Sequence, residues 1–259
     1  MGKEWQLVRR VVSNADIVLE VVDARDPWGT RSERLERLAD RLGKDIIIVI
    51  NKADLVPREV LEKWVRVFRS RNLRAVYVSA ARRLGTRFIW RSIKSVSRKD
   101  VVVVAVVGLP NVGKSTIINI LKGSHSVGTS PIPGYTKHVT RLRAATWLRV
   151  IDTPGVIPRG SKEELALRSA LRPEALDDPV PAAVKLIEMI VSKDPGFLEN
   201  VYKIEYKDPY IFLEMLAKKR GLLAKGGIPR VEEAAKIVIR DWQKGKITFY
   251  LEPKDYGLE

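Results

Sequence analysis

The sequence predicts an α/β fold, with a doubly wound, mostly parallel sheet followed by a smaller all-α domain. Short β-branched runs alternate with amphipathic segments up to about residue 155, which is typical of a parallel sheet covered by helices. Near-continuous apolar runs such as "IIIVI" and "VVVVAVV" indicate strands buried on both faces. After Gly155, Pro-bearing stretches separate helical segments. We therefore expect two domains, residues 1–160 and residues 161–259.

The individual elements follow from the same periodicities. One face of a helix over Arg58–Arg71 would carry Leu61, Trp64, Val65 and Phe68, and a similar stripe indicates a helix around residues 88–96. Strands are expected at Ile17–Val22, Ile46–Ile50, Ala75–Val78, Val101–Val107, Val139–Ala144 and Leu148–Ile151. Helices of the second domain are expected at Pro181–Ser192, Asp208–Leu223 and Arg230–Lys244.

The positive charge is concentrated in the first part of the chain. Residues 1–100 hold 23 Lys+Arg and 13 Asp+Glu, residues 101–160 hold 7 and 1, and residues 161–259 hold 17 and 17. The net charge of +16 therefore divides into +10, +6 and 0. A phosphate site needs only a few of these charges, so the surplus indicates an extended polyanion such as RNA. A solvated basic surface is the alternative.

Composition also excludes several classes of protein. The absence of cysteine excludes a disulfide scaffold and a cysteine-ligated metal site. The apolar run Val101–Val107 is too short to cross a bilayer, and the amino terminus "MGKEWQLVRR" lacks the apolar stretch of a signal peptide. We therefore expect a cytoplasmic protein with no membrane partner.

A phosphate-binding loop is predicted at "GLPNVGKST", Gly108–Thr116, between a strand and a helix that starts near Lys114. The glycines let backbone amides surround the phosphates, whose negative charge the helix amino terminus favours. Lys114 would reach the outer phosphates, and Ser115 would give an oxygen to Mg²⁺. The expected nucleotide contacts in this loop are Pro110, Asn111, Val112, Gly113, Lys114, Ser115 and Thr116.

The stretch "VIDTPG" supplies the next part of such a site. An acidic residue at the end of a strand beside the loop holds magnesium in phosphoryl-transfer proteins. Asp152 is expected to do so, and the Gly155 amide is expected to meet the γ-phosphate.

Two further elements are candidates for base recognition. Asn51–Asp54, "NKAD", resembles the guanine-specificity element of the GTPase class, in which Asp54 would accept hydrogen bonds from guanine, Lys52 would pack along the base and Asn51 would brace the loop. Adenine lacks those donors and would leave a buried carboxylate unpaired. Ser79 and Ala80 resemble the following element, whose backbone amide meets the guanine carbonyl.

The order of these elements along the chain is permuted. Base recognition precedes the phosphate loop here, whereas ordinary small GTPases have the reverse order, so the chain reads as a circularly permuted P-loop GTPase. Permutation costs little when the old termini lie close together, and "SRKD" before Val101 would join them. The permuted order, "LEVVDARDP" near the start and a tail with "LAKKRGLLAKGG" and "DWQKGKI" resemble the YlqF/RbgA family of ribosome-assembly GTPases.

That resemblance implies a function and partners. The chain would bind GTP and GDP, hydrolyse GTP, and assist assembly of the large ribosomal subunit by binding ribosomal RNA, with residues 161–259 as an RNA- or ribosome-binding domain. Asn111 matches an asparagine that helps bind a monovalent cation in potassium-stimulated relatives, so K⁺ is considered beside Mg²⁺.

The switch region departs from the family pattern. The family motif ends Pro-Gly-Thr-Thr, and this chain reads "PGYT", so Thr136 is assigned to magnesium and the γ-phosphate in preference to Thr129 or Thr140. Lys114, Thr136 and Gly155 are thus the catalytic candidates, and Ser115, Thr136 and Asp152 are the metal ligands. Val156 stands where many GTPases carry a water-orienting glutamine, so slow intrinsic hydrolysis is expected. His125 and His138 flank the switch and are weaker candidates for a catalytic histidine.

Two other functions stay open at this point. The chain could act on a different RNA or ribonucleoprotein, or it could be a nucleotide-dependent RNA-binding module with negligible hydrolysis. Because the γ-phosphate sensor runs directly into the second domain, we also expect GTP loss to reorient residues 161–259.

Overall fold

The computed structural model describes residues 3–97, 99–123, 140–153 and 160–258. The chain divides into two compact units. Residues 1–158 and 250–259 form the first unit, and residues 159–249 form the second. The last ten residues thus pack with the first unit rather than with the helical one.

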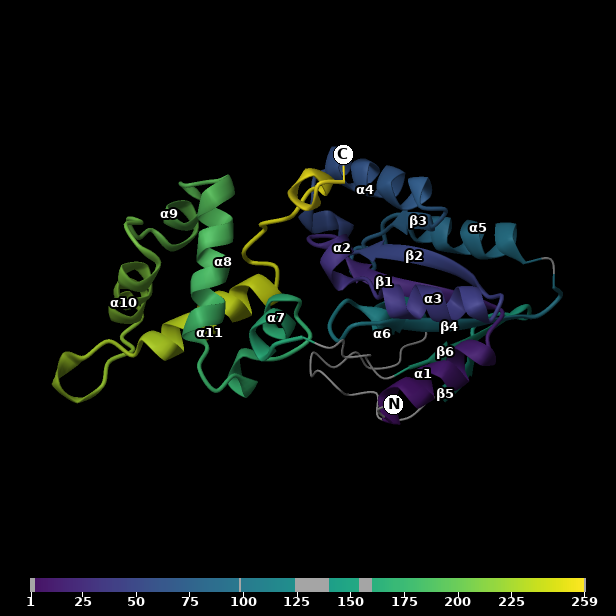
Figure 1. Ribbon diagram of the computed structural model, residues 1–259, viewed down its shortest axis with the longest axis horizontal. Coiled ribbons are helices and arrows are strands. Elements are labelled where there is room, and N and C mark those ends of the chain that lie inside the picture. Colours follow the sequence, from purple (N-terminus) through teal and green to yellow (C-terminus); the bar gives the residue numbers. More distant parts are fainter. Residues whose placement is uncertain (1–2, 98, 124–139, 154–159, 259) are drawn as a thin grey trace. The chain divides into compact units, whose positions relative to one another are not determined.

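The first unit is built on a six-stranded sheet with the order β3-β2-β1-β4-β6-β5. All neighbours pair in parallel except β5, which runs antiparallel to β6 at one edge. This arrangement confirms the predicted doubly wound, mostly parallel α/β fold (Figure 1). The strands are β1 (Ile17–Asp23), β2 (Asp45–Asn51), β3 (Arg74–Tyr77), β4 (Val102–Gly108), β5 (Thr140–Arg143) and β6 (Leu148–Asp152).

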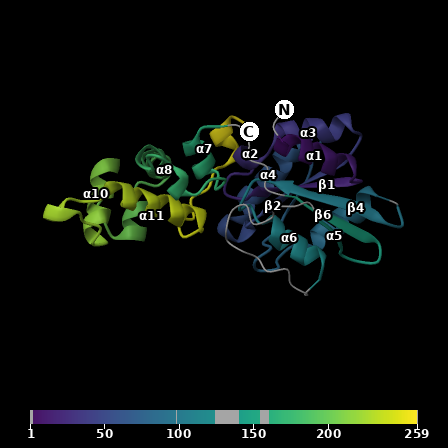
Figure 2. The same cartoon turned by 90° about the horizontal axis from the view of Figure 1, so that it is seen from below.

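Helices cover both faces of this sheet. Figure 2 shows α1 and α3 on one side of the strands and α5 and α6 on the other. Val18 packs with α1 and α3, and Val22 packs with α4, so all three helices share a face, because side chains four residues apart on a strand point the same way. The helices of this unit are α1 (Lys3–Ser13), α2 (Pro27–Thr30), α3 (Glu33–Arg41), α4 (Arg58–Ser70), α5 (Thr86–Val96) and α6 (Lys114–Leu121).

The central strands are almost entirely buried, which explains their unbroken apolar runs. Every residue of β1 is buried, including the charged Glu20 and Asp23. Strands covered on both faces have no solvent side, so a charged residue within one must find its partners inside the protein.

The second unit is helical, as predicted. Its helices are α7 (Lys162–Leu167), α8 (Val180–Lys193), α9 (Phe197–Tyr202), α10 (Pro209–Lys219) and α11 (Val231–Gln243). Its core joins α8, α10 and α11 through buried residues that include Ile187, Phe212 and Val238. No helix in the described ranges is long and apolar enough to cross a membrane.

The C-terminal segment, residues 250–259, belongs to the first unit because specific contacts hold it on α4 and on the loop after β1. The Trp64 indole donates to the Leu251 carbonyl at 3.0 Å, and the Leu251 amide donates to the Arg25 carbonyl at 2.8 Å. Tyr256 donates to Asp26 at 2.7 Å and packs edge-on against Trp64. None of these contacts has a local sequence signal.

Candidate functional site

Among the described residues, several predicted site residues lie at the carboxyl ends of parallel strands. In the parallel ladders Asp23 is level with Asn51, Val21 with Gly108, and Val106 with Asp152. The carboxyl ends of β1, β2, β4 and β6 therefore meet at the same edge, where open α/β sheets bind their ligands.

The phosphate loop has a backbone that requires its glycines. Gly108 and Gly113 adopt φ of 153° and 98°, and Asn111 lies at φ 61° between them. A Cβ on Gly108 would stand 2.3 Å from the Val21 carbonyl oxygen, and one on Gly113 would stand 2.2 Å from the Asn51 side chain. Both glycines are thus fixed by packing as well as by conformation. Pro110, Val112, Ser115 and Thr116 lie in this loop or in the first turn of α6.

Lys114 and Asp152 form the polar centre of the phosphate end. Lys114 is buried, its Nζ donates to the Leu109 carbonyl at 2.7 Å, and burial lowers its pKa to about 8 although the Asp152 charge opposes that shift. Burial also raises the pKa of Asp152, against the attraction of Lys114. One oxygen of Asp152 is buried and has no hydrogen-bond partner among the described residues. Both groups therefore lie in an environment that disfavours their charge.

The unpartnered Asp152 oxygen fits a magnesium site. Mg²⁺ binds through one or two carboxylates together with substrate phosphates, rather than in an all-protein cage. In line with this, the described residues contain no group of three or more His, Asp or Glu side chains that could hold a metal. Ser115 on α6 and Asp152 at the end of β6 are the described candidates for holding the ion. The other predicted ligand, Thr136, lies outside the described residues, as does Gly155.

Asn51 joins the base-reading and phosphate-binding elements. Its side-chain nitrogen donates to the Val112 carbonyl at 2.8 Å, and its side-chain oxygen accepts from the Ala80 amide at 3.0 Å. Asn51 is almost fully buried, so it satisfies two other elements in a region that water does not reach. Three stretches far apart in sequence, the "NKAD" element, the "YVSA" element and the phosphate loop, are thereby held together.

Asp54 is held by two neighbouring side chains. Ser79 donates to one of its carboxylate oxygens at 2.6 Å, and Arg82 contacts the other at 3.2 Å. The guanidinium of Arg82 presents the same kind of N–H donors as the N1 and amino groups of guanine. The Arg82 side chain is mostly exposed. Sequence reasoning missed Arg82, which carries no signal beyond its place two residues after Ala80.

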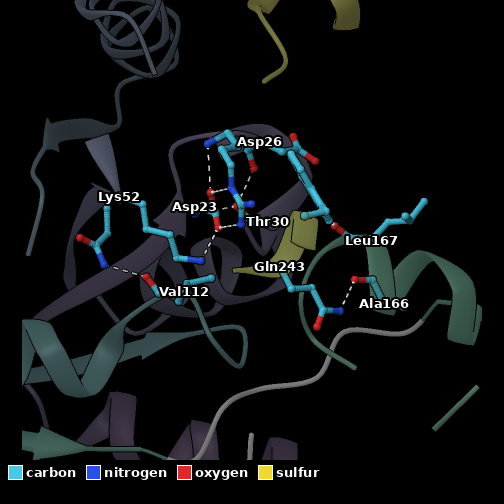
Figure 3. A network of polar contacts seen from close by, with 11 residues as sticks. Asp23, Asp26, Thr30, Lys52, Val112, Ala166, Leu167 and Gln243 are labelled. Atoms are coloured by element: carbon cyan, nitrogen blue, oxygen red, sulfur yellow. Dashed lines mark hydrogen bonds and ion pairs between the residues drawn. The ribbon is translucent and has the colours of Figure 1, made fainter. Parts of the chain in front are cut away.

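Lys52 is held in place by a network of buried charged side chains (Figure 3). Lys52 adopts φ 64°, and its Nζ donates to Asp23 at 2.7 Å. Arg25, itself 1% exposed, donates to both oxygens of Asp23 at 3.0 and 2.8 Å. Although burial works in the opposite direction, Arg25 and Lys52 hold the pKa of Asp23 far below its usual value.

Sequence reasoning also missed Asp23 and Arg25 as site residues. The signal that could have found them is the charged end of an otherwise apolar strand, "IVLEVVD", followed by an arginine. A buried carboxylate that stays charged, as Asp23 does, requires a buried cation. The network joins the "DARDP" stretch to the "NKAD" element through the contact between Asp23 and Lys52.

Comparisons with known proteins identify GTP-binding relatives. A family profile described as "50S ribosome-binding GTPase" matches residues 103–214, and one described as "Elongation factor Tu GTP binding domain" matches residues 5–123. A GTP-binding protein of Methanocaldococcus jannaschii is 37% identical over 98% of this chain and 69% of its own length. Nucleolar GTP-binding protein 2 of Neurospora crassa is 36% identical over 95% of this chain but only 41% of its own length.

Solved structures show the same relationship. GDP-bound YlqF from Thermotoga maritima matches with a TM-score of 0.72 and 26% identity, covering 96% of this chain and 100% of that one. The GNP-bound form matches with a TM-score of 0.67 over 95% of each chain. The nucleotide-binding elements occur in permuted order, and the relatives match nearly the whole chain. The chain therefore belongs to the YlqF family of circularly permuted GTP-binding proteins.

Proposed function

We propose that this protein is a Mg²⁺-dependent GTPase that acts as a switch in assembly of the large ribosomal subunit and binds ribosomal RNA. The observation that carries the nucleotide part is the pair of hydrogen bonds through which Asn51 links the Val112 carbonyl to the Ala80 amide. They support one continuous pocket, with Asp54 at its base end and Lys114 at its phosphate end.

The proposed reaction converts GTP and water to GDP and phosphate. Lys114 would neutralise the outer phosphates, and Ser115 and Asp152 would hold the ion. Bound magnesium supplies the charge stabilisation that phosphoryl transfer needs. Thr136 and the Gly155 amide are proposed to sense the γ-phosphate. Val156 cannot orient an attacking water, so we expect slow intrinsic turnover that a partner accelerates. A K⁺ ion beside Asn111 belongs to the same proposal.

The ribosomal part is supported by relatives and by charge. One matching profile is described as ribosome-binding, and several relatives are described as nucleolar GTPases. The first 160 residues carry the entire net charge of +16, as expected for a partner of RNA. We propose that the helical unit contributes a further contact to the ribosome, and that the protein works in the cytoplasm.

The switch is proposed to act on the helical unit. That unit is inserted between residues 158 and 250, so the moving body would be residues 159–249, while the C-terminal segment stays on the first unit. Hydrogen exchange with GDP and with a non-hydrolysable GTP analogue tests this proposal. Identical profiles across residues 159–249 would contradict it.

Phosphate release is the direct test of the enzymatic proposal. We expect slow release from the protein alone and clear acceleration by large ribosomal subunits, measured in sodium and in potassium buffer. The absence of a glutamine at Val156 favours one rival function, a nucleotide-dependent binding module. Near-zero release under all conditions would support that module.

Partner selectivity requires a separate measurement. Co-sedimentation with large-subunit precursors is expected with the GTP analogue and is expected to weaken with GDP. Preferential binding to transfer RNA or to another ribonucleoprotein would favour the rival RNA-directed GTPase.

A further inference from the structure

One stretch of the first unit has an extreme charge imbalance. Residues 63–99 contain 12 Lys+Arg and no Asp or Glu. By contrast, the whole helical unit, residues 159–249, contains 17 Lys+Arg and 14 Asp+Glu, a net charge of only +3. The stretch runs from α4 through the edge strand β3 and the following loop to the end of α5. We call the exposed basic side chains of this stretch the arginine surface.

These charges are accessible and mostly lack acidic partners. Every basic residue in the described part of the stretch is exposed except Lys63, which is half-buried. Within the described residues, acidic groups pair only with Lys63, Arg82 and Lys99. A surface whose only role was solubility would carry charges of both signs, so this one is built to attract negative charge.

The arginine surface is also hollowed. An open depression of about 450 Å³ lies where the end of α4, β3 and α5 meet, and Arg69, Asn72, Arg74 and Ser92 line it. The Arg74 guanidinium donates to Ser95 on α5 at 2.6 Å, which fixes its direction. Arginine and amide donors around a depression suit the oxygens of a phosphate backbone.

Exposed apolar groups lie beside these cations. Phe88 on α5 is 49% exposed and Leu84 is 58% exposed, although both are large hydrophobic residues. The Arg91 guanidinium lies 6.0 Å from the centre of the Phe88 ring. Aromatic rings and guanidinium planes next to a basic groove are the groups on which unstacked RNA bases pack.

We propose that the arginine surface is the RNA-binding face of this protein, with the depression receiving the phosphate backbone and Phe88 receiving an unpaired base. The inference rests on the proposed function and specifies where in the chain RNA binds. Nine of the 12 cations in the sequence of residues 63–99 are arginines, which bind phosphate in a bidentate manner. The exposed ring and the concave shape favour RNA over an acidic protein segment or a flat membrane.

The surface also adjoins the base end of the nucleotide site. Arg82 belongs to it and contacts Asp54 at 3.2 Å. When guanine takes that place on Asp54, the Arg82 guanidinium is released toward the RNA. The arginine surface is therefore positioned to respond to the nucleotide state at its base end, independently of the γ-phosphate end.

The test uses the full chain and two matched variants. The first replaces Arg69, Arg74, Arg87 and Arg91 by Gln, and the control replaces four exposed cations of the helical unit, Lys207, Lys218, Arg220 and Lys225, by Gln. Thermal unfolding and GTP affinity, expected to be unchanged in both, establish that the variants are folded. The probes are a transcribed RNA hairpin with an unpaired loop, polyglutamate, and vesicles that contain phosphatidylserine.

We expect wild type to bind the hairpin with an affinity that falls steeply as salt increases. Each lost phosphate contact lowers the slope of log K against log salt by roughly 0.7–0.9, so the first variant should lose about 3 units of slope and at least ~10-fold in affinity. Phe88→Ala should weaken binding to the hairpin more than to a fully paired duplex.

Each outcome has a distinct meaning. If both variants bind the hairpin like wild type, the location is wrong while the proposed RNA binding stands. A larger loss in the control variant would move the site to the helical unit. If wild type does not bind RNA, the proposed function fails with this inference, and tighter binding to polyglutamate or vesicles would replace RNA with that partner.

Discussion

The two ends of the nucleotide site differ in how far the protein completes them by itself. At the base end, Asn51 bridges two loops, Ser79 and Arg82 contact Asp54, and Asp23 holds Lys52. At the phosphate end, an Asp152 oxygen is buried without a hydrogen-bond partner among the described residues. The base end is thus preorganised, whereas the phosphate end carries electrostatic strain that a ligand relieves.

This difference assigns separate roles to the two ends. A preformed base end provides selectivity, because it costs nothing to arrange when the correct base arrives. An incomplete phosphate end responds strongly to the presence and the number of phosphates, because these supply the missing charge. Substitutions at the base end should therefore destabilise the free protein, and substitutions at the phosphate end should mainly impair ligand binding.

The largest effect on stability is expected from Asp23→Ala. It leaves the buried Arg25 without its carboxylate and should lower the free energy of unfolding by about 3–5 kcal/mol. The control Glu62→Ala breaks only the exposed pair with Arg58 and should cost less than about 1 kcal/mol. Urea unfolding of both variants measures the difference. Equal stabilities would show that the base end is not held by this network.

The Asp23 contribution should also depend on pH. Its pKa is lowered in the folded state, so its stabilisation is present above the unfolded value and is lost as pH falls below it. Wild type should therefore lose stability between about pH 5 and acidic values more steeply than Asp23→Asn, which has no such carboxylate. Parallel acid titrations of the two proteins measure this difference in the loss of stability.

The next effect concerns affinity at the phosphate end. Lys114→Ala should weaken GTP binding by about 2–4 kcal/mol, because the outer phosphates lose their buried cation. The exposed Lys185→Ala serves as the control and should have little effect. Because the pKa of Lys114 is about 8 in the free protein, wild-type affinity should decline above that pH, and binding there should take up a proton. Calorimetry in buffers of different ionisation enthalpy detects that proton, and its absence would contradict the assignment.

Asp152→Asn should weaken GTP binding in Mg²⁺ without lowering the stability of the protein. The free protein should unfold no more easily than wild type, because a half-buried carboxylate with a raised pKa is removed. GTP affinity in Mg²⁺ should fall at least ~10-fold, whereas affinity measured with excess chelator should change little. A variant that keeps its full response to Mg²⁺ would exclude Asp152 from the metal site.

The smallest effect is expected from Arg82→Ala. Arg82 competes with guanine for Asp54, so its removal should raise affinity for GDP by roughly 1.5- to 5-fold, the 0.2–1 kcal/mol of an exposed ion pair. Arg83→Ala removes a neighbouring exposed cation as the control. Weaker GDP binding in Arg82→Ala would mean that Arg82 assists the base instead.

The strands could be predicted closely from sequence, because burial on both faces leaves a continuous apolar run. The predicted strand Ile46–Ile50, for example, is observed as Asp45–Asn51. The helices at Lys3–Ser13 and Glu33–Arg41 were not predicted, because their many charged residues obscure the apolar stripe, such as Leu35, Leu38 and Ala39 in the second.

The site was predictable only where a motif fixes local backbone. The phosphate loop and the "NKAD" element carry such patterns, and the structure brings Asn51 to Val112 as the permuted order requires. The Asp23–Lys52 pair depends on the register between two strands, and the contact of Leu251 with Trp64 depends on packing across most of the chain. Neither register nor packing leaves a trace in local composition.

The nucleotide selectivity of Asp54→Asn tests most directly whether base recognition and the response to Mg²⁺ belong to separate ends of one pocket. Wild type should prefer GTP over ATP by roughly 10³-fold or more, since adenine leaves the Asp54 carboxylate unpaired. Asp54→Asn should lose this preference and favour XTP, while the response of binding to Mg²⁺ stays that of wild type. Equal affinity of wild type for ATP and GTP, or loss of the Mg²⁺ response in Asp54→Asn, would contradict the separation.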